Sequence, residues 1–279
     1  MSPRVSVVMP TFQNVAFVEA TIESVLGQTF TDFNLLISDH SSTDGTWQVL
    51  QRFATNPRVT LWQTEPGGGA PANWAAVTSR ATGEFVKLVC GDDLLRPRCL
   101  QEQVQAMDAH PSVVLVCARR EVIDAQGRVV FPGRGSARIS GLHNGRWALR
   151  QAVRAGTNIF GEPAAVLMRR RSLEAAGGWW ADFPYVIDEA TYARVLLDGD
   201  LYAVDAPLAA FRLSSGQWSV ALAASQSAQV IAFHEALAAG EPGLLSPHDL
   251  ARGAFMAKGL SLARRLVYLA LARRLTPKG

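Results

Sequence analysis

The stretch EFVKLVCGDDLL, residues 84–95, decides how this chain is interpreted. Apolar and β-branched residues typical of a buried strand lead into a glycine, Asp92 and Asp93. Because like charges repel, two adjacent carboxylates at a strand end need a cation, a set of hydrogen-bond donors or open solvent. The alternative is that both aspartates cap the helix expected near Pro97, since aspartate is common at helix starts.

Outward from this stretch, strand and helix patterns alternate through the first half of the chain. Further apolar strands are expected at residues 5–9, 33–39 and 58–63, with Pro10 ending the first. A helical pattern follows each of them, and a glycine-rich loop at 65–72 precedes the last; the helices are expected over residues 18–26, 47–53 and 73–81. Apolar strands separated by helices predict parallel βαβ units with helices on both faces of one sheet. The expected fold class is therefore α/β.

Ligands of such sheets bind beyond the carboxyl ends of the parallel strands. This rule brings together a set of residues that are far apart in sequence: Pro10, Thr11, Asp39, Asp92 and Asp93. Neither G-x-G-x-x-G after the first strand nor G-x-x-x-x-G-K-[ST] occurs, so a dinucleotide dehydrogenase or a P-loop enzyme is not indicated. A diphosphate beside two aspartates needs a divalent cation between them, and Mg²⁺ or Mn²⁺ suits such oxygen ligands.

The bulk composition limits the classes of protein that come into question. The chain has 279 residues, 48% hydrophobic and 18% charged, enough for one large α/β domain with a sizeable core. A net charge of +3 argues against nucleic acid as a partner, because such proteins normally carry a concentrated basic stripe. Cys90, Cys99 and Cys117 lack C-x-x-C spacing, which predicts free thiols in a reducing compartment. With neither a signal peptide nor a membrane-spanning stretch apparent, we expect a cytoplasmic protein.

Three segments together resemble the family 2 glycosyltransferases of the GT-A fold: VSVVMPTFQN (5–14), LLISDHSSTDGT (35–46) and ATGEFVKLVCGDDLL (81–95). The usual family forms are a strand ending in P-[ST]-[YF]-N, a strand ending in D-[DN]-x-S-x-D-x-T, and A-x-G-x-[YF] before a strand that ends in aspartates. The resemblance covers residues 4–215 and implies a Rossmann-like mixed sheet flanked by helices. Cys90 stands where the family often has a leading aspartate.

The resemblance implies a nucleotide-diphosphate sugar as donor, with a UDP- or dTDP-sugar favoured. Pro10 and Thr11 would line the base pocket, and Asp39 would accept an N–H from a uracil or thymine ring. Asp93 would bind Mn²⁺ or Mg²⁺, with Asp92 beside it toward the ribose or a metal-bound water. Which of these two carboxylates contacts the ion stays open.

The segment VIDEATYARVLLDG, residues 186–199, resembles the family form [ED]-D-x-x-[LF]-x-x-R. The resemblance makes Asp188 the counterpart of the catalytic base, with Glu189 as the nearest rival and a helix N-cap as the alternative role. An inverting transfer requires such a carboxylate, because the acceptor hydroxyl must lose its proton as it attacks opposite the leaving diphosphate. Glu162, Trp180 and Glu189 are expected to contact the acceptor.

A strand near the end of this region, within PLAAFRLSSGQWS (207–219), resembles the family form P-L-x-x-[YF]-R-x-H. Arg212 matches the arginine and is expected to be structural, tying its strand to the helix of Asp188. Ser214 stands where the histidine is frequent, so any help that such a histidine gives at the phosphate or metal is absent or supplied differently.

The expected organisation is a GT-A catalytic domain over residues 1–218, followed by an alanine-rich helical extension over 219–279. Within the domain, residues 1–95 form the half that binds the nucleotide sugar, and residues 96–218 form the half that binds the acceptor. Two arginine pairs bracket an apolar run at 266–272, but they spread around the helix. Two roles stay open for the extension: packing onto the domain or a homodimer partner, and peripheral contact with the inner face of the cell membrane.

Three functions are compatible with these patterns. The favoured one is a metal-dependent inverting glycosyltransferase that acts on a glycan or lipid-linked acceptor in surface polysaccharide or glycolipid assembly. A sugar-nucleotide nucleotidyltransferase should show a glycine-rich activation loop after the first strand, where this chain has PTFQNVAF (10–17). A non-catalytic scaffold that binds sugar nucleotides stays open because two motif positions differ from the family. The presence of Asp39, Asp93 and Asp188 favours activity.

Overall fold

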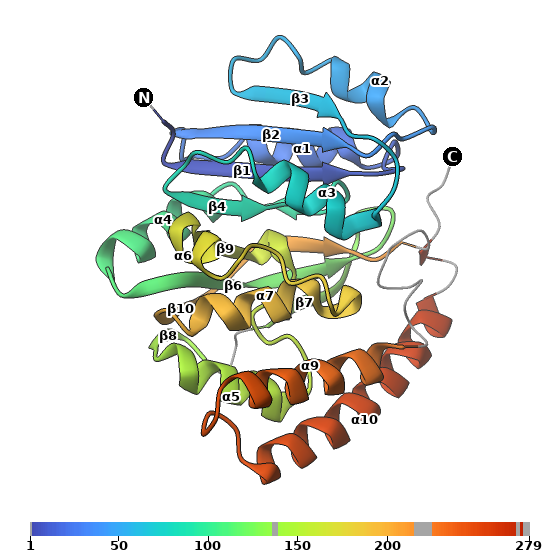
Figure 1. Cartoon of the computed structure of the whole chain (residues 1–279). Coiled ribbons are helices and arrows are strands. Elements are labelled where there is room, and N and C mark those ends of the chain that lie inside the picture. Colours follow the sequence, from blue (N-terminus) through green and yellow to red (C-terminus); the bar gives the residue numbers. More distant parts are fainter. Residues whose placement is uncertain (1, 136–138, 215–224, 272–273, 276–279) are drawn as a thin grey trace.

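A mixed β-sheet forms the centre of the molecule, and helices cover both of its faces (Figure 1). The computed structural model describes residues 2–135, 139–214, 225–271 and 274–275. The strands are β1 (Val5–Thr11), β2 (Phe33–Asp39), β3 (Val59–Gln63), β4 (Phe85–Leu88), β5 (Leu94–Leu95), β6 (Val113–Ile123), β7 (Val129–Arg134), β8 (Gly141–His143), β9 (Val166–Arg169) and β10 (Asp200–Arg212). Their order is β3-β2-β1-β4-β9-β6-β10-β5, with β7 paired to β6 and β8 paired to β10.

The first four strands confirm the predicted parallel arrangement. β2 and β4 flank β1 and run parallel to it, and β3 runs parallel to β2. β9 then lies antiparallel between β4 and β6, which makes the sheet mixed. The prediction that Pro10 ends the first strand is wrong, because β1 continues to Thr11. Proline has no backbone N–H to donate to a neighbouring strand. β1 tolerates Pro10 because its pairing with β4 ends at Val8, before the proline.

Each face of the sheet has its own buried cluster, because successive side chains of a strand point to opposite faces. Val7 and Met9 of β1 belong to the cluster beneath α1, α2 and α4, whereas Val8 belongs to the cluster beneath α3, α5, α6, α7 and α9. The helices are α1 (Val18–Leu26), α2 (Thr46–Gln51), α3 (Gly69–Thr78), α4 (Cys99–Ala109), α5 (Gly145–Ala155), α6 (Arg170–Ala175), α7 (Ile187–Leu196), α9 (Gln226–Gly240), α10 (Pro247–Leu271) and the short 3₁₀ helices η1 (Pro163–Ala165) and η2 (Pro184–Val186).

Helix α3 begins at Gly69, inside the stretch that was expected to be a loop. Gly67, Gly68 and Gly69 have φ angles of +118°, +72° and +61°. Glycine adopts this region at little steric cost, whereas residues with a side chain rarely do. The three glycines therefore turn the chain from β3 into α3, and α3 carries Asn73 to the end of β1, where its Nδ2 donates to the carbonyl of Thr11 at 3.1 Å.

The C-terminal helices pack onto the rest of the molecule, which is one of the alternatives expected for this segment; the homodimer and the membrane contact stay predictions. α10 lies along α9 and α5 (Figure 1). Ser246 and Asp249 form a capping box at its start: Asp249 Oδ2 accepts from Ser246 N at 3.0 Å, and Ser246 Oγ accepts from Asp249 N at 3.2 Å. Asp249 also pairs with Arg150 and Arg154 of α5. The expected start of the extension at residue 219 lies outside the described residues.

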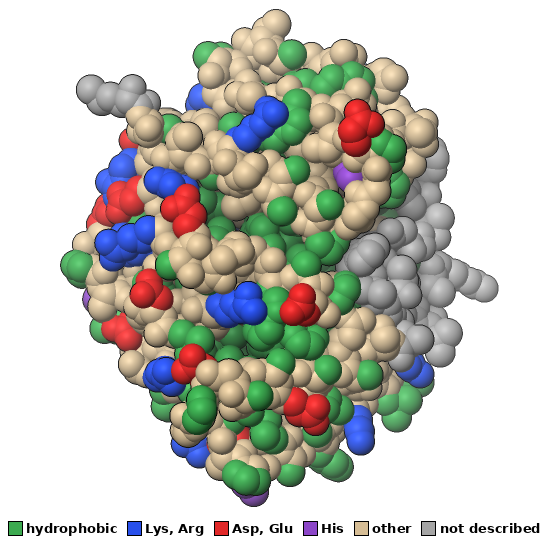
Figure 2. Space-filling model, in the orientation of Figure 1, with side chains coloured by type: hydrophobic (Ala, Val, Ile, Leu, Met, Phe, Trp, Pro, Cys, Tyr) green, Lys and Arg blue, Asp and Glu red, His purple; other side chains and the backbone are tan. Residues whose placement is uncertain are grey.

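On the face seen in Figure 2, Lys and Arg side chains are interspersed with Asp and Glu, and hydrophobic side chains reach the surface over the α9–α10 region at the bottom of the view. Within the described ranges, no helix has both the length and the apolar character needed to span a bilayer. All three cysteines are free thiols, as predicted.

Candidate active site

The first group of predicted residues meets where β1 and β2 end. Asp39 is fully buried, and both of its carboxylate oxygens accept hydrogen bonds. Oδ1 accepts from Ser42 Oγ at 2.5 Å and Thr11 Oγ1 at 3.3 Å, and Oδ2 accepts from Ser42 N at 3.2 Å and Gln63 Nε2 at 3.1 Å. An ionised carboxylate offers about four acceptor positions, so those of Asp39 are in use. A ligand that donates an N–H to Asp39 must therefore replace one of these donors.

Gln13 and Ser41, which the sequence did not single out, hold the loops after these two strands in strained backbone. Their φ angles of +53° and +54° lie in the left-handed region, which is unusual for residues with a side chain. The loops are joined by a hydrogen bond from Gln13 N to Ser42 Oγ at 2.9 Å, and Phe12 packs edge-on against His40. Backbone strain of this kind persists where the surrounding contacts impose it, and it is enriched at ligand sites.

The carboxylate pair, Asp92 and Asp93, is buried in the turn between β4 and β5. Asp93 is only 1% exposed and Asp92 is also buried. Arg212 N donates to Asp93 Oδ1 at 3.0 Å, and Arg212 Nε donates to the carbonyl of Asp92 at 2.8 Å. Arg212 therefore ties β10 to this turn, and the expectation that it ties β10 to the helix of Asp188 is wrong. The helix-cap alternative for the two aspartates is also wrong, because α4 begins after Arg98 and has no side-chain cap.

The chemistry of the Asp92–Asp93 pair fits a divalent cation. Burial and the neighbouring charge of Asp92 raise the pKa of Asp93 well above its usual range, so the contacts from Arg212 stabilise its ionised form only in part. Carboxylate oxygens are the hard ligands that Mg²⁺ and Mn²⁺ prefer. In the part of the chain that the structure describes, no group of three or more His, Cys, Asp or Glu side chains could hold a metal. The pair could thus supply part of a coordination shell, which phosphate oxygens and water would complete.

Asp188 lies in the first turn of α7, opposite the carboxylate pair. Its Oδ2 accepts from Asn158 Nδ2 at 2.9 Å, and its Oδ1 accepts from Glu189 N at 2.8 Å. The N-cap position belongs to Val186, so the alternative role of Asp188 as an N-cap is wrong. Asn158 also accepts from the backbone N–H groups of Phe160 and Gly161, and it therefore fixes Asp188 relative to the turn before η1.

The surroundings of Asp188 make its carboxylate a stronger base than an ordinary aspartate. Burial raises the pKa of Asp188 to about 7, and the charge of Glu162 adds to this rise. Hydrogen bonds from the Glu189 backbone and from Asn158 oppose it, because they stabilise the ionised form. A carboxylate with a pKa near neutrality can both stay ionised and hold a proton that it receives, which is the property of a general base.

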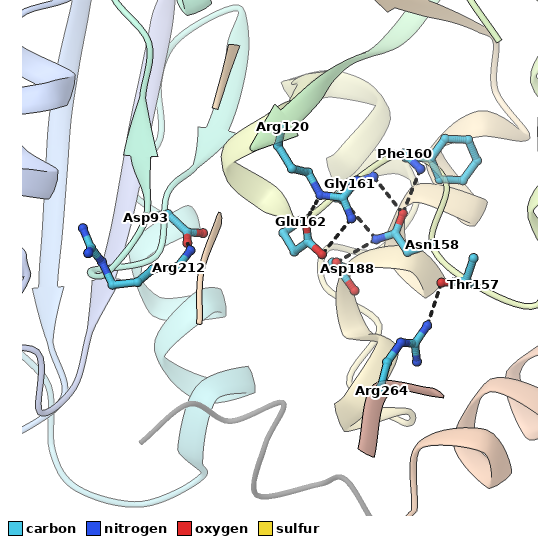
Figure 3. Close-up of polar contacts among 10 residues, drawn as sticks. All are labelled: Asp93, Arg120, Thr157, Asn158, Phe160, Gly161, Glu162, Asp188, Arg212 and Arg264. Carbon is cyan, nitrogen blue, oxygen red and sulfur yellow. Dashed lines mark hydrogen bonds and ion pairs between the residues drawn. The ribbon is translucent and has the colours of Figure 1, made fainter. Parts of the chain in front are cut away.

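A buried ion pair lies beside Asp188. Arg120 of β6 donates to Glu162 through both Nε and Nη2, and the Nη2–Oε1 distance is 2.9 Å (Figure 3). Burial by itself would raise the pKa of Glu162, but the charge and hydrogen bonds of Arg120 outweigh it and lower this pKa. Glu162 is therefore held ionised and partly exposed. Arg120 was missed in the sequence because no motif marks it; its position follows from the pairing of β6 with β9 and β10.

Glu189 and Trp180 lie in the packing around α7. Glu189 is 1% exposed, and neither of its carboxylate oxygens has a hydrogen-bond partner among the described residues. Burial, followed by the charge of Asp188, raises the pKa of Glu189 to about 8, and Arg264 partly opposes this rise. The ring of Trp180 is covered on one face by the guanidinium of Arg194 at 3.7 Å, and it packs edge-on against Phe183.

Two groups of carboxylates lie on opposite sides of the candidate site. Burial raises the pKa of the Cys90 thiol well above the usual value, and the charges of Asp93, Asp92, Asp188 and Glu162 add to this effect. Figure 3 shows Asp93 and Arg212 on one side, and the set of Arg120, Glu162, Asn158 and Asp188 on the other. The site can therefore hold an anionic group with its counter-ion on one side and accept a proton on the other.

Solved structures share this fold. The Staphylococcus aureus protein TarS, in complex with UDP-GlcNAc, matches 92% of this chain and 71% of its own with a TM-score of 0.71 and 18% identity. The mannosyltransferase PcManGT from Pyrobaculum calidifontis, in complex with GDP-Man and Mn²⁺, matches 98% of this chain and 76% of its own with a TM-score of 0.66 and 20% identity. The protein has the GT-A fold, with the mixed sheet and flanking helices that were predicted.

The sequence matches the family described as Glycosyl transferase family 2 over residues 6–177, and the chain belongs to this family. A putative glycosyltransferase of Bacillus subtilis, EpsE, is 32% identical over 127 residues, which are 45% of this chain and 46% of EpsE. The uncharacterized protein MT1568 of Mycobacterium tuberculosis is 30% identical over 204 residues, which are 70% of this chain and 62% of MT1568. The chain thus spans less than two thirds of the length of these relatives.

Proposed function

We propose that the chain is a metal-dependent inverting glycosyltransferase that moves a sugar from a nucleotide-diphosphate donor to a hydroxyl acceptor. The observation that carries this proposal is the arrangement in Figure 3, with Asp93 of the buried Asp92–Asp93 pair on one side of the site and Asp188 on the other. A transfer by in-line displacement needs charge compensation at the leaving diphosphate and proton removal at the opposite end. Membership of glycosyl transferase family 2 supports the reaction class.

The nucleotide base would bind at the ends of β1 and β2, against Pro10, Thr11 and Asp39. We favour a uracil or thymine base, whose imide N–H would replace the Gln63 amide on Asp39 Oδ2, the contact of 3.1 Å. The solved complexes of TarS with UDP and with UDP-GlcNAc support a uridine donor. PcManGT was solved with GDP-Man, so the binding test described below also includes GDP.

Asp93, with Asp92 beside it, would hold Mn²⁺ or Mg²⁺ together with phosphate oxygens of the donor. When bound, the ion neutralises charge that develops on the leaving diphosphate. The backbone N–H of Arg212 keeps Asp93 Oδ1 oriented, and Arg212 Nε holds the carbonyl of Asp92, so this residue positions the turn. The Mn²⁺ in the PcManGT complex supports the choice of ion.

Asp188 would act as the general base. As the acceptor oxygen forms its bond to the anomeric carbon, the bond from that carbon to the diphosphate oxygen breaks, and the hydroxyl proton passes to the carboxylate of Asp188. The electron pair of the broken bond leaves with the nucleoside diphosphate, and the anomeric configuration inverts. Asn158 would orient Asp188 through the 2.9 Å hydrogen bond to Oδ2.

The acceptor would lie against Glu162, whose carboxylate Arg120 holds ionised and partly exposed, with the ring of Trp180 farther out. Glu189 was predicted to contact the acceptor, but its side chain is only 1% exposed. We propose that it acts instead through its backbone N–H, which donates to Asp188 Oδ1 at 2.8 Å. An acceptor in surface polysaccharide or glycolipid assembly is supported by the names of relatives, which include a poly(ribitol-phosphate) β-N-acetylglucosaminyltransferase and a putative teichuronic acid biosynthesis glycosyltransferase.

The test is calorimetric titration of the purified chain with UDP, dTDP and GDP, each with Mn²⁺ and with EDTA. We expect one of them to bind only with the metal, and Asp93→Ala to abolish this binding. Asp188→Asn should bind the donor as the wild type does but lose transfer by 10²-fold or more, on the order of what a general base contributes. Asp205→Asn, at an exposed aspartate of β10, is the matched control for both.

Four outcomes would contradict the proposal or a part of it. Near-normal transfer by Asp188→Asn would remove the base assignment. No nucleotide binding by the folded protein would exclude the donor site, and donor binding without hydrolysis or transfer to any acceptor would favour the non-catalytic scaffold. If the protein instead joined a nucleoside triphosphate to a sugar phosphate and released pyrophosphate from the triphosphate, it would be a nucleotidyltransferase.

A further inference from the structure

Helix α10 carries an exposed apolar stripe on the outside of the molecule. Phe255, Leu262 and Leu266 are 78%, 62% and 60% exposed, which is unusual for three large apolar side chains on one helix. At 100° per residue their directions fall within about 40° of one another, so they form one line along the helix. Figure 1 shows α10 at the bottom of the view, on the side of α9 that is away from the sheet.

Cations border this stripe on both sides. By the same helical geometry, Arg252 lies about 60° to one side of Phe255, and Lys258 and Arg265 lie about 60–80° to the other. From Leu250 to the last residue of the sequence there is no Asp or Glu. An apolar stripe between two cationic edges is the pattern of a helix that lies in the plane of a membrane surface.

The acidic groups near α10 are mostly neutralised by the protein itself. Asp249 is buried and pairs with Arg150 and Arg154, and Glu241 pairs with Arg146 at 2.5 Å. Glu235 of α9 lies closer to the stripe, in a small hollow that it shares with Ala251 and Ala254 of α10. Among the described residues, Arg252 and Lys258 thus give the outer edge of α10 a predominantly positive charge.

We propose that the stripe of Phe255, Leu262 and Leu266 docks onto an anionic lipid bilayer, with Arg252 and Lys258 contacting its headgroups. A second copy of the chain fits less well, because a two-fold contact through this stripe would bring the same cations of both copies together. Against anionic lipid the same cations attract the surface, at about 1 kcal/mol each, or about fivefold in affinity.

The position of α10 links this surface to the candidate active site. Just beyond its end, Arg274 pairs with Asp124 at 2.8 Å, and the carbonyl of Asp124 accepts from Arg212, the residue that holds the Asp92–Asp93 turn. If the proposed function holds, docking would keep the donor site close to the membrane surface, where a lipid-linked hydroxyl acceptor would lie. The docking itself does not require the transfer reaction.

The experiment is flotation of the full chain with vesicles of phosphatidylglycerol mixed with phosphatidylcholine, and with vesicles of phosphatidylcholine alone. We expect binding to the anionic vesicles that weakens as salt rises, because ions screen the headgroup contacts. Replacing the stripe by Phe255→Ser, Leu262→Ser and Leu266→Ser together should reduce binding by more than tenfold. Arg252→Gln and Lys258→Gln should each reduce it about fivefold.

Matched controls lie elsewhere on the surface. Val129→Ser on β7, at an exposed apolar residue, and Arg52→Gln next to α2, at an exposed arginine, should leave vesicle binding unchanged. Equal binding to neutral and anionic vesicles, or no binding to either, would overturn the proposal. A dimer in sedimentation that the triple serine variant converts to a monomer, without vesicle binding, would identify a second copy as the occupant. Nucleotide titration of the same variants separates a failed docking surface from a failed donor site.

Discussion

At the scale of single residues, the proposed base role of Asp188 predicts that its proton affinity sets the pH at which transfer occurs. Its pKa is raised to about 7 by burial and by Glu162, and only the ionised form can accept a proton. We therefore expect kcat/KM to rise with pH up to about 7 and then to level off. The measurement is a pH–rate profile with saturating metal. A profile that is flat between pH 5 and pH 8 would contradict the role of Asp188.

Asn158→Ala tests the same carboxylate from its partner's side. The Asn158 hydrogen bond stabilises ionised Asp188, so its removal should raise the pKa of Asp188 and move the midpoint of the profile to higher pH, by about 1 pH unit. Asn158→Ala also removes the hydrogen bonds to the backbone of Phe160 and Gly161. The loss of these contacts alone should lower activity equally at every pH and leave the midpoint of the profile unchanged. Asn56→Ala, in the turn before β3, is the control.

Glu189 links the site to the stability of the fold. Its pKa is about 8 in the folded state, against about 4.3 in an unfolded chain. The protonated form of Glu189 therefore contributes to the free energy of unfolding. This contribution is fully present below the unfolded-state pKa of about 4.3, and it is lost as the pH rises through the folded-state pKa of about 8. Glu189→Gln cannot lose a proton, so its free energy of unfolding should not fall in this way. Measured by urea unfolding, the difference in free energy of unfolding between the variant and the wild type should shift in favour of the variant by roughly 1–3 kcal/mol from pH 6 to pH 9. Glu235→Gln, at an exposed position of α9, should show no such trend.

At the scale of elements, Asp249 anchors α10 to α5. Burial by itself would raise its pKa, but hydrogen bonds from Ser246 and the charge of Arg150 lower it to about 2. Its contribution is therefore present above the unfolded pKa of about 3.9 and is lost as the pH falls toward 2. Asp249→Asn should lower the free energy of unfolding at pH 7 by about 2–3 kcal/mol.

The matched control for this prediction is Asp205→Asn. Asp205 pairs with Arg119 at 3.3 Å on the surface, and an exposed pair contributes below about 1 kcal/mol. An equal effect of the two substitutions in urea unfolding would mean that the buried capping box and its arginines do not stabilise the contact between α10 and α5.

The elements themselves were largely predictable, and their ends were less so. β2 and the helix over residues 18–26 appear as expected, because runs of apolar residues and a 3.6-residue period are local signals. The end of β1 depends on where β4 stops pairing, and the start of α3 depends on three glycines in left-handed backbone. Neighbouring strands and loops decide these boundaries, so a local pattern cannot show them.

At the scale of the whole molecule, donor and metal should act as a single stabilising ligand. A ligand at 100 times its Kd stabilises the folded state by about 2.7 kcal/mol, which corresponds to a rise in Tm of about 5–10 °C for a chain of this size. We expect this rise with the nucleotide and Mn²⁺ together, and its loss on adding EDTA. The measurement is differential scanning calorimetry. In Asp93→Ala, the nucleotide and Mn²⁺ together should cause no rise in Tm. A rise in Tm equal to that of the wild type would exclude Asp93 as the metal ligand.

The candidate site comes from every part of the sheet, and this limits what the sequence could reveal. Asp39, Asp93 and Asp188 follow strands or begin a helix in motifs of known spacing, so they were predicted from residues 35–46, 81–95 and 186–199. Arg120 and Asn158 lie in no motif and reach the site only through strand pairing and the turn before η1. The buried state of Glu189 likewise depends on α7 packing against its neighbours.

The sequence by itself determined the class of fold, and it predicted the edge of the sheet where the candidate site lies and the principal carboxylates of that site, because hydrophobic period and motif spacing are properties of neighbouring residues. Only the tertiary structure decided which polar groups face one another: Arg120 on Glu162, Asn158 on Asp188, and the backbone N–H of Arg212 on Asp93. It also decided which face of α10 is exposed. Burial and pairing between distant residues set these properties, since pKa values and exposed surfaces depend on what surrounds a side chain in space.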